Sequence, residues 1–563
     1  MCCVVLVFIF ASVQESGTKC REVRGKPLDV ARELAREGRI EEVVAIVDAL
    51  AKRNTQLELL LAHLRLGRNK SERVSKEQIA LALEEIAALA TAGEVDEALK
   101  KAASELEQAS KENGGRPEAN KPPRQPSVRR PPPPGARRVD NPIPIPEGER
   151  ACPTCGTPRK TLRIETTEVV DLIQAEVIVR LDQREVCSCP KCEAEVARAP
   201  QGDKVVVGGT YGSNLVADLV VGKYRDGLPL HRQREILRRL GLDMPSSSMA
   251  DQITWATDLL APIWRGLIAQ ALVSQVLHVD ATSMPVRDKE TGGAVHLGSL
   301  WGYVGCNAGN PTCAVYLFTS TGKKVAQREG EVGPEDLLAA RRGFVVADAG
   351  SVFDKSFQRE ELIEVGCNMH ARRYFVKALE AGDRRAALAV DAFRALYDVE
   401  DGSRQATTSE RLARRREKSR PVYDKLREWA RLQRGAEPPA SLLAKAIGYL
   451  GNHEVALTRF LDDGDLPIDN GIVERLHRDV AILRKNCLFA GSYEGGRRAA
   501  IALSVLASCE VLGINPMTYV ASVLPELART TASELQLRSL LPSSWKATNA
   551  PRLAAPSETP AEG

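Results

Sequence analysis

Apolar positions between Ile468 and Cys487 recur at the spacing of one helix face. They are Ile472, Val473, Leu476, Val480 and Leu483. Residues three and four apart lie on the same face of an α-helix, so this spacing predicts an amphipathic helix with a buried stripe. The preceding Asp469-Asn470-Gly471 predicts a turn at the start of that helix.

Short runs of consecutive apolar residues fill the middle of the chain and predict β-strands. We expect strands at Val276–Asp280, Leu300–Cys306, Thr312–Thr319, Phe344–Asp348 and Leu362–Cys367, with a helix at Pro334–Arg341. Three strands, a helix and then a fourth strand is the element order of a ribonuclease-H-like α/β fold. This order places Asp280 near the end of the first strand and Asp348 at the end of the fourth, side by side.

The charged region 27–110 has a helical pattern of its own. Val43, Leu50, Leu57 and Leu64 follow a seven-residue spacing. Three heptads are the lower limit for predicting a coiled coil, so a dimerising leucine zipper and an ordinary helical hairpin are both compatible with this pattern.

Two further regions are predicted to be helical. In residues 201–271, Ser246 or Ser247 could cap a helix of a helix-turn-helix arrangement, although this helix is acidic and favours packing over DNA reading. Residues 371–466 predict an all-α insertion ahead of the Glu474 helix. Its basic run Arg411–Arg420 is compatible with DNA-backbone contacts or with a solvated helix face.

Two C-x-x-C pairs predict a zinc-ribbon-like module. Cys152 and Cys155 form the first pair, and Cys189 and Cys192 form the second. Four thiolates on two tight turns complete the tetrahedral shell of one structural Zn²⁺ ion. Strand-like runs lie between the pairs, and Cys187 is an alternative ligand because it lies two residues before Cys189.

Together these patterns predict a multidomain α/β protein. The expected divisions are 1–26, a mis-assigned start or disordered leader; 27–110, the helical region; 111–148, a Pro/Arg-rich linker; 149–200, the zinc ribbon; 201–271, a helical DNA-binding or packing region; 272–380, the first part of the core; 381–466, the all-α insertion; 467–528, the second part of the core with the Glu474 helix; and 529–563, a C-terminal motif and disordered tail.

Composition limits the class of protein. The chain has 563 residues, of which 43% are hydrophobic and 27% charged, with a net charge of +4. This excludes a uniformly basic polymer, but it permits local positive patches that bind nucleic acid. The 13 cysteines, four of them in C-x-x-C pairs, favour a reducing compartment over a disulfide framework.

The apolar start, Met1–Val13, is too short to span a bilayer. It has no positively charged segment before the apolar run and no clear cleavage site after it, so a mis-assigned start is favoured over a signal peptide. No other stretch approaches the length of a membrane span, and we expect no membrane partner.

Asp280, Asp348 and Glu474 are candidate ligands of divalent metal ions. An aspartate at the end of a buried strand is costly unless it meets a partner or a ligand. Carboxylate oxygens suit Mg²⁺ or Mn²⁺, and two such ions are the usual apparatus for phosphoryl transfer.

These carboxylates and the sequence around them resemble the DDE transposases of the insertion-sequence-66 (IS66) family, bacterial mobile elements. The resemblance covers roughly residues 55–545. It is carried by four segments: H-V-D-A-T-S-M-P-V, C-N-M-H-A-R-R-Y-F, L-T-R-F-L-D-D-G-D-L-P-I-D-N-G-I-V-E-R and R-K-N-C-L-F-A-G-S-Y-E-G-G-R-R-A-A. The last two together are highly specific.

The resemblance implies metal-dependent cleavage of the ends of an insertion sequence and their transfer to target DNA. Asp280, Asp348 and Glu474 then bind two Mg²⁺ or Mn²⁺ ions, with supporting roles for His370, Arg372 and Arg373. The candidate DNA-binding cations are Arg475, Arg478, Arg484, Lys485, Arg497 and Arg498. A homodimer or higher oligomer on DNA, accessory proteins of the same element and a cytoplasmic, nucleoid-associated location are also implied.

The chain departs from the usual family pattern at several positions. Ala281, Gly471-Ile472-Val473, Asn368-Met369 and Cys487 replace the usual residues, whereas the three carboxylates remain. Two alternatives therefore stay open: a catalytically silent DNA-binding relative, and a metal-dependent nuclease that cuts DNA without joining strands. For His370, a structural role is an alternative to a supporting one.

Overall fold

The computed structural model describes residues 97–113, 154–158, 175–188, 196–199, 209–287, 292–320, 332–348, 350–529 and 534–554, together with Asp140, Arg150, Ile164 and Thr166. Its contacts divide the chain into two compact units. The described parts of the first unit are 97–113, 346–348, 350–351 and 364–471. The rest of the described chain belongs to the second unit.

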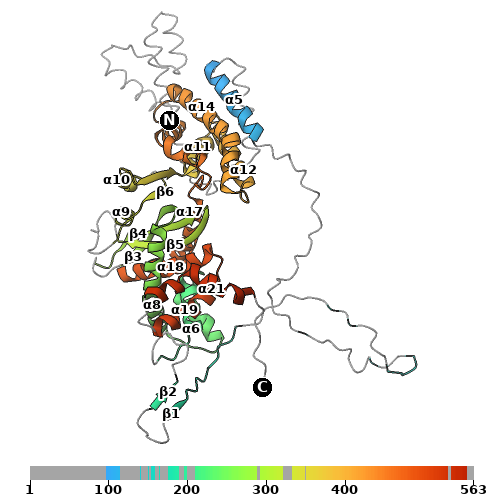
Figure 1. Ribbon diagram of the computed structural model, residues 1–563, viewed down its shortest axis with the longest axis vertical. Coiled ribbons are helices and arrows are strands. Elements are labelled where there is room, and N and C mark those ends of the chain that lie inside the picture. The colour runs from blue at the N-terminus through green and yellow to red at the C-terminus, as the bar shows by residue number, and fades with distance from the viewer. Residues whose placement is uncertain are drawn as a thin grey trace, which may run out of the picture. The chain divides into compact units, whose positions relative to one another are not determined.

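The described residues contain a five-stranded sheet, with strands in the order β5-β4-β3-β6-β7. The five strands are β3 (Val276–Arg287), β4 (Val295–Asn307), β5 (Asn310–Thr319), β6 (Gly343–Ala347) and β7 (Leu362–Gly366). Strands β3, β4, β5 and β6 are labelled in Figure 1. All five predicted strands are present, and β3, β4 and β5 pair antiparallel. The mixed α/β class is therefore confirmed.

Two strand boundaries were predicted wrongly. Strand β4 begins at Val295 rather than Leu300. Strand β3 continues past Asp280 to Arg287, so this carboxylate lies in mid-strand. The extension pairs with the first part of β4 and buries Met284 and Val286, an alternation that supports a strand. Asp348, in contrast, follows the last residue of β6 directly, as predicted.

Two long helices of the second unit pack against β5. They are α8 (Ser246–Leu272) and α18 (Tyr493–Val511). The Ser504 hydroxyl accepts a hydrogen bond of 2.7 Å from the Tyr316 amide, and the Ser508 hydroxyl accepts one of 3.0 Å from the Ala314 amide. The Trp264 indole on α8 donates to the Tyr316 carbonyl at 3.0 Å. Helix α8, from the region 201–271, thus packs on the sheet.

The second unit contains further helices, of which α17 (Gly471–Cys487) packs on the sheet through Val473 and His477. The others are α6 (Ser213–Tyr224), α7 (Leu230–Arg239), α9 (Pro334–Ala339), η3 (Ser351–Phe353), α10 (Asp354–Phe357), α19 (Pro516–Arg529), α20 (Glu534–Leu540) and α21 (Pro542–Ala554).

Two expectations about helix ends were wrong. Helix α8 begins at Ser246 with Pro245 in the capping position, and no side chain caps it. Helix α21 continues to Ala554, within the region 529–563 for which a C-terminal motif and a disordered tail were expected. Trp545 anchors this helix by packing edge-on against Tyr519, with ring centroids 5.5 Å apart.

In the first unit, the described residues are predominantly helical. The helices are α5 (Glu97–Asn113), α11 (Asn368–Glu380), α12 (Ala386–Gly402), α13 (Thr408–Arg414), the π-helix η4 (Arg415–Ser419), α14 (Arg420–Ala436), α15 (Leu442–Asn452), α16 (Glu454–Thr458) and the 3₁₀-helix η5 (Arg459–Leu461). Phe375, Phe393 and Trp429 are buried at its centre. Helix α5 packs on α12 and α14.

The basic run Arg411–Arg420 has a role that the sequence did not indicate. Arg415 is buried, pairs with Glu400 at 2.7 Å, and donates to the carbonyls of Phe460, Asp463 and Leu466. Arg411 donates to the Gly464 carbonyl. Several of these cations therefore hold the unit together, which neither expected interpretation included.

The predicted zinc module is described only in part. Strands β1 (Val186–Ser188) and β2 (Val196–Arg198) form an antiparallel pair. Residues 175–185, which include a predicted strand, have no regular secondary structure. The predicted leader, the proposed zipper heptads and nearly all of the predicted linker lie outside the described residues. No described helix is long and apolar enough to cross a membrane.

Candidate active site

Glu474 lies in the first turn of α17. The Asp469 carboxylate accepts a 2.8 Å hydrogen bond from the Gly471 amide, which forms the predicted turn before the helix. Val473, Leu476, Val480 and Leu483 are buried, as their spacing predicts, whereas Ile472 and Glu474 are only half-buried. The stripe thus fixes the orientation of the helix and places Glu474 at its edge, with one carboxylate oxygen, Oε1, buried.

The loop before α17 is held by the C-N-M-H segment within the first unit. The Asn470 amide donates to Cys367 Sγ at 3.3 Å. The Asn368 amide nitrogen donates to the carbonyls of Leu457 and Ile468, at 3.0 and 3.1 Å. Asn368 replaces a residue usual in the resembled family, and these hydrogen bonds give the replacement a structural role.

Asp280 belongs to a row of three residues that crosses the sheet. It pairs with Gly302 on β4, and Gly302 pairs with Tyr316 on β5. Paired residues of neighbouring strands point to the same face of a sheet. Asp280 and Tyr316 therefore flank a position that has no side chain.

The ring of His477, from α17, occupies the space over Gly302. A Cβ atom on Gly302 would lie 2.7 Å from His477 Cε1. His477 Nδ1 lies 3.4 Å from the Tyr316 hydroxyl, and Nε2 lies 3.5 Å from Asp280 Oδ2. Burial lowers the pKa of His477 to about 4, against the opposing effect of a hydrogen bond with the Asp280 backbone, so this imidazole is neutral at neutral pH.

Sequence reasoning missed His477. The available signal was its position three residues after Glu474 on the same helix, beside the apolar stripe. Because residues three apart are neighbours on a helix surface, the contact of His477 with Asp280 brings Glu474 to the same part of the second unit. Of the three predicted ligands, Asp280 and Glu474 belong to the second unit. Asp348 lies in the first unit and is half-buried.

The donor set of these residues fits a hard cation. Asp280 and Glu474 present carboxylate oxygens, the ligands that Mg²⁺ and Mn²⁺ prefer. The Asp280 side chain is 18% exposed, and its Oδ1 accepts a hydrogen bond of 2.8 Å from the Ala281 amide. An ionised carboxylate in so enclosed a position favours a nearby positive charge.

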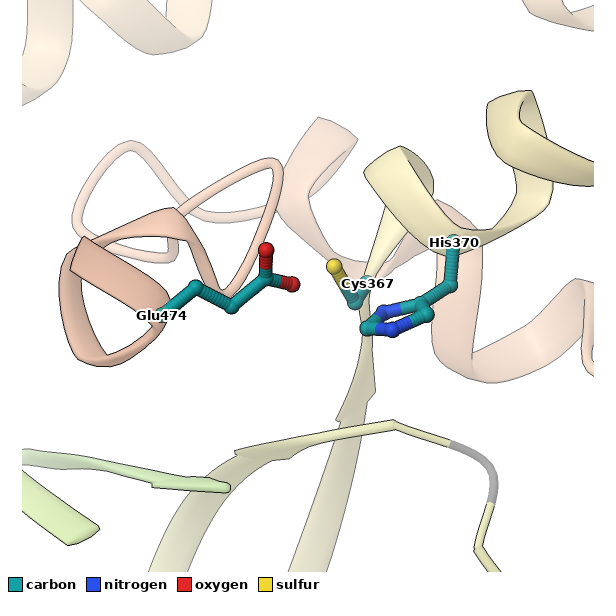
Figure 2. Close-up of side chains that lie close together, drawn as sticks. All are labelled: Cys367, His370 and Glu474. Atoms are coloured by element: carbon teal, nitrogen blue, oxygen red, sulfur yellow. The ribbon is translucent and has the colours of Figure 1, made fainter. Parts of the chain in front are cut away.

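Figure 2 shows the side chains of Cys367 and His370, which belong to the first unit, and of Glu474, which belongs to the second. A thiolate and an imidazole are softer donors than carboxylates and favour Zn²⁺ over Mg²⁺. Cys367 and His370 therefore differ in chemistry from the predicted set of three carboxylates. Arg372 and Arg373 follow His370 on α11, and both are half-buried.

The six candidate DNA-binding cations fall into two groups. Arg484 donates to the Ser283 carbonyl at 2.7 Å, Arg497 pairs with Glu494, and Arg498 makes two hydrogen bonds to Asp258. The other three, Arg475, Arg478 and Lys485, are exposed. Within the described chain, we find no ion pair for these three, so their charge is available to a ligand.

Arg475 and Arg478 line a cavity of about 340 Å³ on another side of α17 from His477. Arg225 forms an ion pair with Asp479 and another, of 3.1 Å, with Glu510, and all three residues contribute to the wall. Burial raises the pKa of Asp479, and the Arg225 guanidinium opposes this effect. The cavity thus combines fixed ion pairs with two accessible cations.

Of the four predicted zinc ligands, only Cys155 lies within the described residues. Cys155 is exposed, and the alternative ligand Cys187 is exposed on β1. Cys152, Cys189 and Cys192 lie outside the described residues.

Comparisons with known proteins identify relatives along most of the chain. The family model "Transposase IS66 family" matches residues 208–498. The uncharacterised protein y4hP of Sinorhizobium fredii (strain NBRC 101917 / NGR234) is 31% identical over 523 residues, which cover 88% of this chain and 89% of the relative. The uncharacterised protein y4qI of the same organism is 27% identical over 555 residues, covering 96% of each chain.

Proposed function

Because this chain belongs to the IS66 transposase family, we propose that it is a DDE transposase that cuts the ends of an insertion sequence and joins them to target DNA. In the reaction, water attacks a phosphodiester at the end of the element and releases a 3′-hydroxyl. That hydroxyl then attacks a phosphodiester of the target. Both steps exchange one P–O bond for another.

The proposed ligands of two Mg²⁺ or Mn²⁺ ions are Asp280, Asp348 and Glu474. Bound there, the ions would supply activation of the attacking oxygen and stabilisation of the leaving one. His370, Arg372 and Arg373 would support this site from α11. The observation that carries the proposal is the contact of the Glu474 helix with Asp280 through His477.

The sheet supports a ribonuclease-H-like core. Along the chain, three antiparallel strands (β3, β4 and β5) are followed by helix α9 and then by β6 and β7. In the sheet, the strand order is β5-β4-β3-β6-β7. In this arrangement β3 and β6 are neighbours, which agrees with a site that uses Asp280 and Asp348 together. Residues 381–466 would be the all-α insertion between the fifth strand and α17.

DNA would be held chiefly through its phosphates. Arg475, Arg478 and Lys485 are the best placed cations, since they are exposed and unpaired within the described chain. Such contacts provide affinity and strong salt dependence rather than sequence choice. One structural Zn²⁺ bound by Cys152, Cys155, Cys189 and Cys192, assembly as an oligomer on DNA, and accessory proteins of the same element complete the proposal.

The test is cleavage and joining of a labelled duplex that carries the host element's own end. We expect the wild-type protein with Mg²⁺ to nick the duplex and transfer the strand, and Glu474→Gln to lose both activities by at least about 100-fold, because a metal ligand is removed. Glu428→Gln, an exposed change on α14, is the matched control and should remain active.

Other outcomes favour the alternatives. Tight, Mg²⁺-independent binding without cleavage by either protein, also with the accessory proteins of the element present, would favour a silent DNA-binding relative. Cleavage without strand transfer would favour a metal-dependent nuclease. Undiminished cleavage by Glu474→Gln would overturn the assigned role of this residue.

A further inference from the structure

We infer that His477 is a positioning residue. It orients the Asp280 carboxylate for metal binding through a series of side-chain contacts that starts at the Tyr316 hydroxyl. The inference rests on the proposed function, since it takes Asp280 as a metal ligand. It adds a residue that neither the sequence motifs nor the family match assigns. All of its contacts lie within the second unit.

The series of contacts begins at Tyr316, a residue whose backbone is held in place. Tyr316 is 1% exposed. Its amide donates to the Ser504 hydroxyl of α18, and its carbonyl accepts from the Trp264 indole of α8. Two helices therefore fix the backbone from which the Tyr316 hydroxyl projects.

The hydroxyl and the carboxylate together determine where the imidazole carries its proton. His477 Nε2 is buried, lies 3.5 Å from Asp280 Oδ2 and has no hydrogen-bond partner among the described residues. An ionised carboxylate only accepts hydrogen bonds, so we assign the N–H to Nε2, the nitrogen that faces it. Nδ1 is then an acceptor, and the Tyr316 hydroxyl donates to it. The opposite tautomer would place a lone pair against the carboxylate.

The absence of a side chain at Gly302 leaves space on the sheet for the His477 ring. Gly302 lies between Asp280 and Tyr316 in the register, and a Cβ there would approach His477 Cε1, Val473 and Tyr316 at 2.7, 3.1 and 3.2 Å. Glycine in the interior of a strand weakens it and often marks close approach of another group. Here the approaching group is the imidazole that bridges the two flanking side chains.

This arrangement has a functional consequence beyond packing. Ligating carboxylates are usually hydrogen-bonded by neighbours, and the loss of such a neighbour typically costs about 10- to 100-fold in metal affinity or activity. The same contact also ties α17, which carries Glu474, to the strand that carries Asp280. His477 would therefore set the orientation of one ligand and the position of a second.

The experiment measures Mn²⁺ binding by the full-length protein, from the spectrum of free Mn²⁺ at equilibrium. We expect His477→Leu, which keeps an apolar volume but no donor, to weaken binding by about 10-fold. His477→Gln, which retains an N–H donor, should recover part of that loss. His231→Leu, an exposed histidine on α7, is the control and should bind like the wild type.

A second variant keeps the test valid if His477→Leu does not fold. Tyr316→Phe removes only the hydroxyl, and its ring still fills the buried site. It should weaken Mn²⁺ binding in the same direction, but by less. The spectrum of bound Mn²⁺ in the wild type should show no directly coordinated nitrogen, because His477 acts through Asp280.

Three results would overturn the inference. The first is unchanged Mn²⁺ affinity in both His477→Leu and Tyr316→Phe; the second is equal loss in His477→Leu and His477→Gln with a matching fall in thermal midpoint, which indicates packing alone. The third is imidazole nitrogen bound to Mn²⁺, which makes His477 a ligand. Failure of the proposed function is distinguishable, because wild-type protein would then bind no Mn²⁺ in a manner sensitive to Asp280→Asn.

Discussion

At the residue scale, the most constrained position of the candidate site is one that has no side chain. Gly302 costs backbone entropy in a strand interior, where a β-branched residue would be favourable. Its neighbours in the row, Asp280 and Tyr316, explain the choice, because His477 fills the space above it. The glycine is thus part of the site, although it offers no chemical group.

Gly302→Ala should therefore destabilise the protein. The added methyl group must displace His477 or the strand, and overpacking of this kind costs about 1–3 kcal/mol. A fall in the urea midpoint at constant slope would show it. The control is Gly448→Ala in α15, where no heavy atom lies within 4 Å of the new Cβ. There alanine should stabilise by about 0.5–1 kcal/mol, and equal effects at both glycines would contradict the explanation.

At the element scale, the π-helix η4 serves as a clamp in the first unit. It carries Arg415, the buried guanidinium that binds Glu400 and the carbonyls of residues 460, 463 and 466. The segment so held leads directly to Asp469-Asn470-Gly471, the turn that starts the Glu474 helix. A cation from the basic run therefore stabilises the approach to the candidate site.

Arg415→Met should cost about 3–5 kcal/mol, because it leaves Glu400 without its buried partner and three carbonyls without a donor. The free energy of unfolding of the full chain measures this cost. Arg416→Met, one residue along and exposed, should change stability by no more than about 0.5 kcal/mol. A comparable loss in Arg416→Met would show that general charge, rather than the clamp, matters.

At the scale of the whole molecule, the small net charge of +4 conceals an uneven distribution. Many arginines form ion pairs within the protein, as Arg415 and Arg498 do. Arg475 and Arg478, in contrast, are exposed along one cavity. DNA affinity should therefore depend on a few accessible cations rather than on the total charge.

Arg475→Gln and Arg478→Gln should each weaken DNA binding across sequences. Each should also reduce the slope of log affinity against log salt by about 0.9, because one fewer counterion is released. Titration of a labelled duplex at several salt concentrations measures the slope. Arg404→Gln, whose arginine is exposed but paired with Asp401, is the control. An unchanged slope in both cavity variants would place the DNA elsewhere.

The sequence by itself determined the elements and the family. Apolar runs predicted all five strands, the 3.6-residue stripe predicted α17, and the four motif segments indicated the family that the comparisons showed. These features are local: periodicity and motif spacing are properties of neighbouring residues. The same local reasoning placed Asp348 directly after β6 but ended β3 too early. The second half of β3 is a strand because it pairs with the first part of β4, and this pairing is not visible in the local pattern.

Only the tertiary structure decided which side chains meet. His477 and Tyr316 lie 161 positions apart, and Asn368 and Ile468 lie 100 apart, so no sequence window contains either contact. The structure also decided which arginines are internal and which are exposed, since an arginine inside a clamp has the same local pattern as one on a surface. Pairing and burial arise from the approach of distant segments, and that approach is what folding adds to the sequence.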